Sequence, residues 1–167
     1  MSRAFVKEDS EDPGEPVKRQ PSGKPNYVTP AGLDSLKGRA AELAWLRAGL
    51  MSKQRLDEPR SLELRQAETD LEYYETQLKR AILVDNRGLA AEDVRFGATV
   101  ALSETGGTVR EYKIVGEDEA DAAAGKINWG SPLAGAMLGA GPGAQVVLPR
   151  KTGVIQLEII SVRYPKE

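Results

Sequence analysis

The chain of 167 residues contains no cysteine and no histidine. Without cysteine there is no disulfide framework, no thiolate metal site and no cysteine nucleophile. Without histidine the chain lacks the commonest general base near neutral pH, the usual zinc ligand and the Ser-His-Asp triad. Most self-contained hydrolytic mechanisms are therefore excluded, and we expect a protein that is not itself an enzyme.

The chain also lacks an excess of positive charge, with 23 Lys and Arg residues against 25 Asp and Glu residues. Proteins that bind the phosphate backbone without sequence preference usually carry a clear basic excess, so direct DNA binding is disfavoured. No apolar run is long enough to span a bilayer, and the first nine residues lack the pattern of a secretory signal. These features predict a soluble, cytoplasmic monomer with no membrane partner.

The N-terminal stretch is rich in proline and poor in apolar residues. Half of the ten prolines lie within the first thirty residues, namely Pro13, Pro16, Pro21, Pro25 and Pro30. Charges of both signs surround them, so the stretch buries too little apolar surface to offset the entropy of ordering it. We therefore predict that residues 1–25 form a disordered tail.

Residues 26–84 have the pattern of two helices. Thr29 is a plausible N-cap, with Pro30 at the first helical position, where its missing N–H costs nothing. Farther along, apolar residues follow the 3-4 spacing of a coiled-coil seam. These seam residues are Leu64, Ala67, Leu71, Tyr74, Leu78 and Ala81. The pattern predicts an antiparallel coiled-coil hairpin, and an ordinary helical pair packed flat on a core is the alternative.

The tip of this hairpin is expected at residues 54–61. Pro59 cannot continue a helix from the preceding turn but suits the first turn of a new one. We therefore expect the second helix to begin near Pro59, with Asp57 or Glu58 close to its N-terminus. Held out on a stalk, these two carboxylates could complete a metal site in another protein. The alternative, capping of the second helix, is favoured by the residues alone.

Residues 85–167 predict a small α+β domain, because the apolar period switches to two. The expected strands are residues 96–102, 109–116, 126–129, 145–149 and 154–164, mostly antiparallel. Ser131 and Pro132 form an N-cap and N1 pair that opens one short helix. Between two of these strands lie four acidic residues, Glu117, Asp118, Glu119 and Asp121. Such residues could bind Mg²⁺, but a solvated loop is the favoured interpretation.

Three stretches of this second half resemble the C-terminal domain of the bacterial GreA/GreB transcript-cleavage factor family. They are residues 96–100, 112–121 and 127–134, and their order and spacing are those of the family. The hairpin upstream is similar to the family's N-terminal coiled coil. The resemblance extends over about residues 26–164 and leaves only the proline-rich tail outside.

The resemblance implies a fold, a partner and a mode of action. Residues 85–167 would form a domain like the FK506-binding proteins (FKBP-like) that docks at the rim of the secondary channel of bacterial RNA polymerase. The coiled coil would enter that channel, and nucleic acid would be contacted only indirectly. In the family, two acidic residues at the tip help to hold a Mg²⁺ ion shared with the polymerase active site, so that the polymerase cuts backtracked RNA. No cofactor of the chain's own is implied.

The sequence departs from the family at both functional positions. The family's acidic tip motif is absent, and the tip carries adjacent carboxylates, Asp57 and Glu58, on a hairpin about two heptads shorter. Ser131 and Pro132 are retained, but Gly130 stands where the family usually has Asp or Asn. We expect polymerase contacts from five consecutive residues: Trp129, Gly130, Ser131, Pro132 and Leu133.

These observations predict a Gre-like regulator of transcription elongation that binds RNA polymerase without stimulating cleavage. One alternative is a genuine cleavage factor that uses Asp57 and Glu58. Another is an FKBP-like prolyl isomerase or chaperone. An isomerase needs a deep aromatic-lined pocket, and two Phe, two Trp and five Tyr residues are a thin supply for one.

Overall fold

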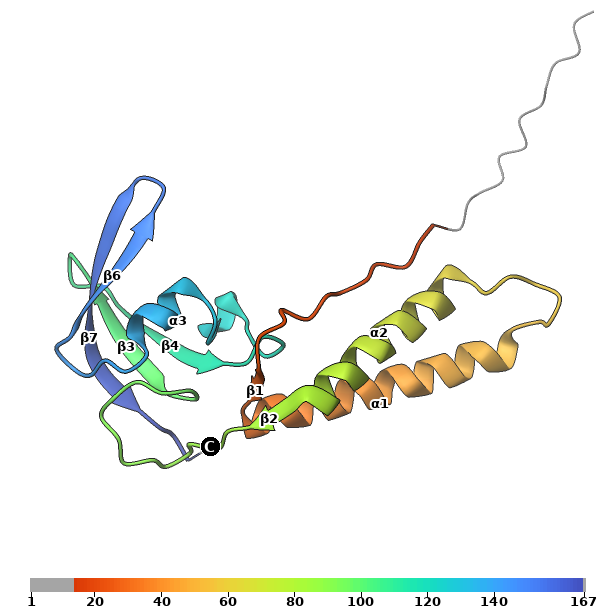
Figure 1. Cartoon of the computed structure of the whole chain (residues 1–167), viewed down its shortest axis with the longest axis horizontal. Helices are drawn as coiled ribbons and strands as arrows, with labels where there is room; N and C mark the ends of the chain where they lie inside the picture. Colours follow the sequence, from red (N-terminus) through yellow and green to blue (C-terminus); the bar gives the residue numbers. More distant parts are fainter. Residues whose placement is uncertain (1–13, 167) are drawn as a thin grey trace, which may run out of the picture.

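The computed structural model describes residues 14–166, so the first half of the predicted tail, residues 1–13, lies outside the described residues. A helical hairpin projects from one side of a sheet domain that carries one short α-helix (Figure 1). The predicted α+β class is confirmed. The elements in chain order are β1 (Asn26–Val28), α1 (Pro30–Lys53), α2 (Leu62–Arg80), β2 (Ala81–Leu83), β3 (Thr99–Glu104), β4 (Val109–Val115), η1 (Ala122–Ala124), β5 (Lys126–Asn128), α3 (Pro132–Met137), β6 (Gln145–Arg150) and β7 (Gly153–Arg163).

The first helix begins as predicted and the second does not. Thr29 accepts a hydrogen bond from the backbone N–H of Gly32 at 2.9 Å, which caps α1. The predicted start of α2 at Pro59 is wrong, because Ser61 caps the helix by accepting from Leu64 N at 3.2 Å. The Gln54 side-chain amide donates to backbone carbonyls of the intervening residues, which holds them in a loop.

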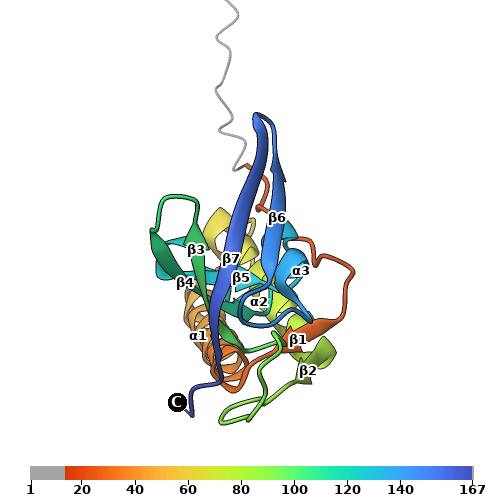
Figure 2. The same cartoon turned by 90° about the vertical axis from the view of Figure 1, so that its left-hand side faces the viewer.

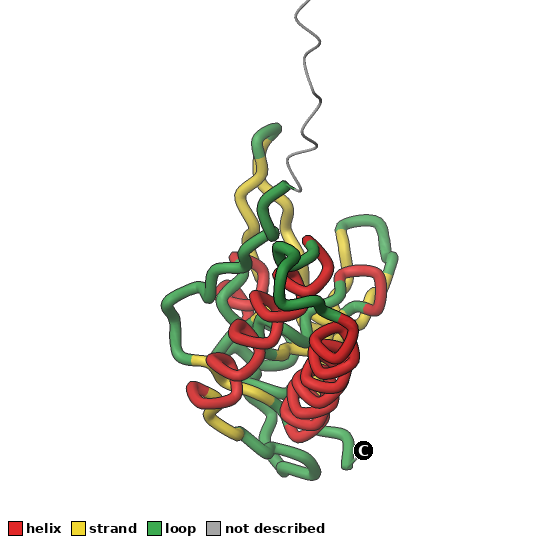
Figure 3. Tube along the Cα trace, turned by 90° about the vertical axis from the view of Figure 1, so that its right-hand side faces the viewer, coloured by secondary structure: helices red, strands yellow, loops and turns green. Residues whose placement is uncertain are grey.

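The hairpin seam follows the predicted pattern in its outer half. Leu43 of α1 is buried, as are Leu64 and Ala67 of α2. Seen from the tip, the two helices lie side by side in front of the sheet domain (Figure 3). Toward the base the buried position shifts to Gln77, and the predicted seam residue Leu78 is only half-buried. This shift occurs because the base of α2 also packs against the sheet domain.

The C-terminal domain is a five-stranded sheet with the order β5-β4-β3-β7-β6. Its pairs are antiparallel except β4 with β5, which run parallel, so the sheet is mixed and mostly antiparallel, as predicted. The short α3 packs on a core that includes Leu102, Ile114, Met137 and Ile159. The first strand begins later than predicted, because Gly97 has a left-handed φ of 82° and ends the turn before it. The β6–β7 ribbon projects beyond the rest of the sheet (Figure 2).

A small parallel sheet at the base of the hairpin was not predicted. It pairs β1 with β2 in the register Asn26 with Ala81 and Val28 with Leu83. The Asn26 side-chain amide also donates to the Gln77 carbonyl at 2.9 Å. This pairing ties the segment before α1 to the segment after α2 and so closes the base of the hairpin.

A joint of hydrogen bonds and close backbone packing connects the hairpin to the sheet domain. The buried Gln77 amide donates to Glu117 Oε1 at 2.5 Å and to Asp118 Oδ2 at 2.7 Å. Tyr73 donates its hydroxyl to Asp118 Oδ1 at 2.7 Å. Gly116, directly after β4, lies against the Tyr27 backbone. The joint fixes how the hairpin projects from the sheet.

None of the helices within residues 14–166 is both long and apolar enough to cross a membrane. Residues 14–25 contain no helix or strand and lie alongside α2 (Figure 1). The disorder expected for the tail stays a prediction.

We predict that Gly116→Ala loosens the joint. A Cβ at Gly116 would overlap the carbonyl oxygen of Tyr27, and backbone cannot move aside as a flexible side chain can. We expect a loss of about 1–3 kcal/mol in the free energy of unfolding, measured by urea denaturation. The control is Gly135→Ala in α3, where nothing lies within 4 Å of the new Cβ. Equal stability of the two variants would contradict the packing described for the joint.

A second prediction concerns the pH dependence of the joint. Burial, together with the Asp118 carboxylate, raises the pKa of the Tyr73 phenol above its ordinary value. A pKa raised by folding means that the contribution of Tyr73 to stability is complete below about pH 10 and is lost as the pH rises toward the raised pKa. We expect Tyr73→Phe to cost about 1 kcal/mol at neutral pH, because the pair is only half-buried.

The measurement is the difference in unfolding free energy between wild type and Tyr73→Phe as a function of pH. The difference should be constant from pH 7 to 9.5 and shrink above pH 10. A difference that grows above pH 10 would show that the sign of the shift is wrong.

Candidate functional site

The hairpin tip presents both predicted acidic residues to solvent. Asp57 and Glu58 are exposed, and Leu56 beside them is fully exposed. The Arg55 Nε lies 3.4 Å from Asp57 Oδ1 and 3.5 Å from Glu58 Oε1. Both carboxylates therefore face one guanidinium of their own loop. The favoured prediction that they cap α2 is wrong, because Ser61 takes that position.

A Mg²⁺ ion does not fit this tip. Mg²⁺ binds ionised carboxylates in a near-octahedral shell at about 2.0–2.1 Å and needs their oxygens turned toward one point. Here the nearest oxygens of both carboxylates lie against the Arg55 guanidinium, so they are not turned toward a common metal position. Within residues 14–166, no group of three or more carboxylates is arranged to hold a metal ion.

The second acidic cluster belongs to the joint and is not a solvated loop. Glu117 and Asp118 accept the hydrogen bonds from Gln77 and Tyr73 described above. Glu119 accepts from the Thr29 hydroxyl at 2.5 Å, and its other oxygen lies 3.8 Å from Lys126 Nζ. The remaining member, Asp121, caps the 3₁₀ turn η1. Each of these four carboxylates accepts at least one hydrogen bond from the protein, which gives the cluster a structural role in the joint and in η1.

The five predicted contact residues are consecutive and run from the turn after β5 into the first turn of α3. We refer to residues 129–133 as the docking loop. Pro132 is exposed at the first position of α3, and Ser131 caps that helix by accepting from Ala134 N at 3.3 Å. The Gly130 N–H donates to the Asn128 side chain at 3.0 Å. Capping by Ser131 is thus confirmed, and it leaves the exposed Pro132 ring available to a partner.

Two of the five residues are partly engaged in packing. The Trp129 ring meets the Tyr27 ring edge-on, with centroids 5.0 Å apart and an interplanar angle of 67°. Leu133 packs against the core of the sheet domain. Trp129 therefore joins the sheet domain to β1 as well as forming one side of the docking loop. Within the loop, Pro132 is the most accessible of the predicted residues.

Sequence reasoning missed Lys24, which lies across the docking loop. Its Nζ donates to the Gly130 carbonyl at 3.3 Å and lies 6.0 Å from the centre of the Trp129 ring. A lysine within a proline-rich stretch carries no signal of such a contact. Only the folded path of residues 14–25 reveals it.

The tip and the docking loop lie at opposite ends of the hairpin (Figure 1). No pocket among the described residues is lined by both the tip and the docking loop. The aromatic residues of the sheet domain, Phe96, Tyr112, Trp129 and Tyr164, pack on its core. The tip and the docking loop are therefore two separate surfaces joined by the helical hairpin.

Comparisons with known proteins give a consistent relationship. Residues 89–164 match the family described as transcription elongation factor, GreA/GreB, C-term. The chain is 36% identical over 163 residues to the transcription elongation factor GreB of Neisseria meningitidis serogroup B (strain ATCC BAA-335 / MC58), covering 84% of this chain and 95% of the relative. It is 37% identical over 98 residues to the transcription elongation factor GreA of Nitratidesulfovibrio vulgaris (strain DP4), covering 58% of this chain and 60% of the relative.

Two solved structures also align with the chain at low similarity. GreA factor homolog 1 (Gfh1) of Thermus thermophilus is 21% identical, with a TM-score of 0.39 and coverage of 84% of this chain and 99% of that one. The transcription elongation factor GreA/GreB from Nitrosomonas europaea is 19% identical, with a TM-score of 0.41 and coverage of 83% and 99%. The sequence identity to GreB, which extends over hairpin and sheet domain alike, shows that the chain belongs to the GreA/GreB family of transcription elongation factors.

Proposed function

We propose that the protein binds bacterial RNA polymerase at the rim of the secondary channel, inserts its helical hairpin there and regulates elongation without stimulating transcript cleavage. Membership of the family supports the partner. The observation that carries the second half of the proposal is the tip, where Asp57 and Glu58 share the guanidinium of Arg55.

Docking is assigned to the loop of residues 129–133. The Pro132 ring is exposed and rigid, so it loses little conformational entropy when a partner covers it. Ser131 holds the start of α3 and thereby the direction of that ring. The Trp129–Tyr27 contact fixes the loop relative to the base of the hairpin, so that a docked loop also sets the direction of the stalk.

The hairpin occupies space in the channel but lacks the chemistry for cleavage. Helix α1 has 24 residues, which corresponds to roughly 36 Å at 1.5 Å per residue. Resemblance to the family implies a stalk about one heptad shorter per arm, which retracts the tip by roughly 10 Å. Metal coordination tolerates far smaller displacements. A tip with paired charges and an exposed Leu56 would fill the channel without completing a metal site.

The test for the missing chemistry is RNA shortening in a backtracked elongation complex. We expect no acceleration when the protein is added, and the double variant Asp57→Ala, Glu58→Ala should behave like wild type. Added together with a genuine cleavage factor, the protein should slow that factor's cleavage by competing for the channel. Acceleration by wild type that disappears in the double variant would support the alternative, a cleavage factor that uses these two carboxylates.

The test for docking is the affinity of two proline variants for core RNA polymerase. Pro132→Ala removes an exposed ring and keeps a good helix former at the first position of α3. We expect it to weaken binding by roughly fivefold or more, as for a residue at the centre of an interface. The control is Pro142→Ala, an exposed proline in a loop of the same domain. Binding of Pro132→Ala at wild-type strength would contradict the assignment of the docking loop.

A further inference from the structure

Residues 14–25, called the N-terminal arm below, are held along α2 by contacts to their backbone. The Gln66 side-chain amide accepts from Val17 N at 2.7 Å and donates to Val17 O at 2.9 Å. Near the outer end of α2, the Arg65 guanidinium donates to the Gly14 carbonyl at 2.9 Å. In these bonds the side chains of α2 contact the backbone of the arm. The path of the arm along α2 is therefore fixed without a contribution from the arm's own side chains.

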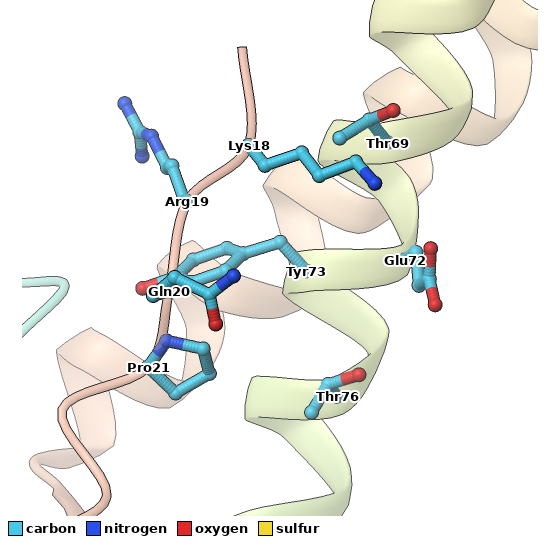
Figure 4. A pocket seen from close by; sticks show the side chains of 8 residues that line it. All are labelled: Lys18, Arg19, Gln20, Pro21, Thr69, Glu72, Tyr73 and Thr76. Atoms are coloured by element: carbon cyan, nitrogen blue, oxygen red, sulfur yellow. The ribbon is translucent and has the colours of Figure 1, made fainter. Parts of the chain in front are cut away.

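An arginine of the arm adds a side-chain anchor halfway along. The Arg19 guanidinium donates to the Tyr74 hydroxyl at 3.0 Å and lies 5.9 Å from the centre of the Tyr73 ring. Figure 4 shows Arg19 and Tyr73 beside a cavity of about 240 Å³ between the arm and α2. Because Tyr73 also bonds Asp118, this part of the arm is connected to the joint. The arm and the docking loop are therefore both attached to the base of the hairpin, where the joint lies.

The last residues of the arm bring Lys24 to the docking loop. The Arg80 guanidinium donates to the Lys24 carbonyl at 2.8 Å, and Lys24 Nζ in turn reaches the Gly130 carbonyl. A Cβ at Gly130 would lie 3.0 Å from that Nζ and 3.3 Å from Lys24 Cδ. The missing side chain at Gly130 leaves the room that the lysine occupies. The Lys24 side chain is thus in direct contact with the docking loop at Gly130.

The seated lysine keeps most of its binding capacity. An ammonium group has three N–H donors, and the Gly130 carbonyl takes one of them. Lys24 is exposed, and within residues 14–166 neither Lys24 nor the adjacent Arg80 forms an ion pair. A cation without an ionic partner among the described residues, Lys24, therefore borders the docking loop, and a second, Arg80, holds the Lys24 backbone. Such an arrangement favours an acidic group on whatever surface covers the loop.

We propose that Lys24 extends the docking surface and binds a carboxylate of the polymerase that faces the docking loop. This inference rests on the proposed function, because it assumes that the loop docks on the polymerase. A protein carboxylate is favoured over nucleic-acid phosphate, because binding along a phosphate backbone uses several cations and the whole chain carries a net charge of −2. The composite surface thus combines residues from two distant parts of the sequence.

The test is the binding of Lys24 variants to core RNA polymerase without nucleic acid, measured across a range of salt concentrations. We expect Lys24→Ala to weaken binding about threefold and Lys24→Glu about tenfold at low salt, chiefly through slower association. Lys24→Arg should stay within about twofold of wild type, because it keeps the charge and the reach. The salt dependence of binding should be shallower for Lys24→Ala.

The matched control is Lys18→Glu, which makes the same charge change at an exposed position of the same arm, six residues earlier. A Lys24→Glu variant that binds no more weakly than Lys18→Glu would overturn the inference. So would a loss seen only with a complete elongation complex, since that result would assign Lys24 to nucleic acid. If wild type itself fails to bind core polymerase, the proposed function fails together with this inference. Binding by wild type that is insensitive to Lys24 overturns the inference alone.

Discussion

The hydrogen bonds from one buried glutamine hold the two halves of the protein together. Gln77 of α2 donates to the carboxylates of Glu117 and Asp118, and Tyr73, one turn earlier, donates to Asp118 as well. Hydrogen bonds to charged acceptors are stronger than neutral ones. Gln77 lies beside the seam residue Leu78, and its hydrogen bonds to the sheet domain fix the angle between the hairpin and that domain.

Because that angle is fixed, the position of the docking loop determines the position of the hairpin tip. The docking loop is set by Trp129 against Tyr27, and the tip is carried at the far end of the same stalk. A partner that binds the loop therefore determines where the tip lies. At that tip, Asp57 and Glu58 both lie within ion-pair distance of the single guanidinium of Arg55.

The sequence predicted the elements better than their connections. Periodicity placed both helices and the sheet, and the caps Thr29 and Ser131 were recognisable because capping is a local interaction. The start of α2 was misplaced, because the signal of Pro59 competed with that of Ser61. The small β1–β2 sheet and the position of Lys24 depend on contacts between residues more than fifty positions apart. The periodicity of apolar residues and the capping signals involve only neighbouring residues, so they cannot reveal contacts between such distant positions.

The central claim is that the stalk lies within the polymerase channel while the loop holds the rim. A cryo-EM map of the protein bound to core RNA polymerase tests it most directly. We predict density for α1 and α2 inside the secondary channel, with residues 129–133 against the rim and the Asp57–Glu58 tip short of the catalytic Mg²⁺. A map with the hairpin outside the channel, or with both tip carboxylates at the catalytic metal, would contradict the account.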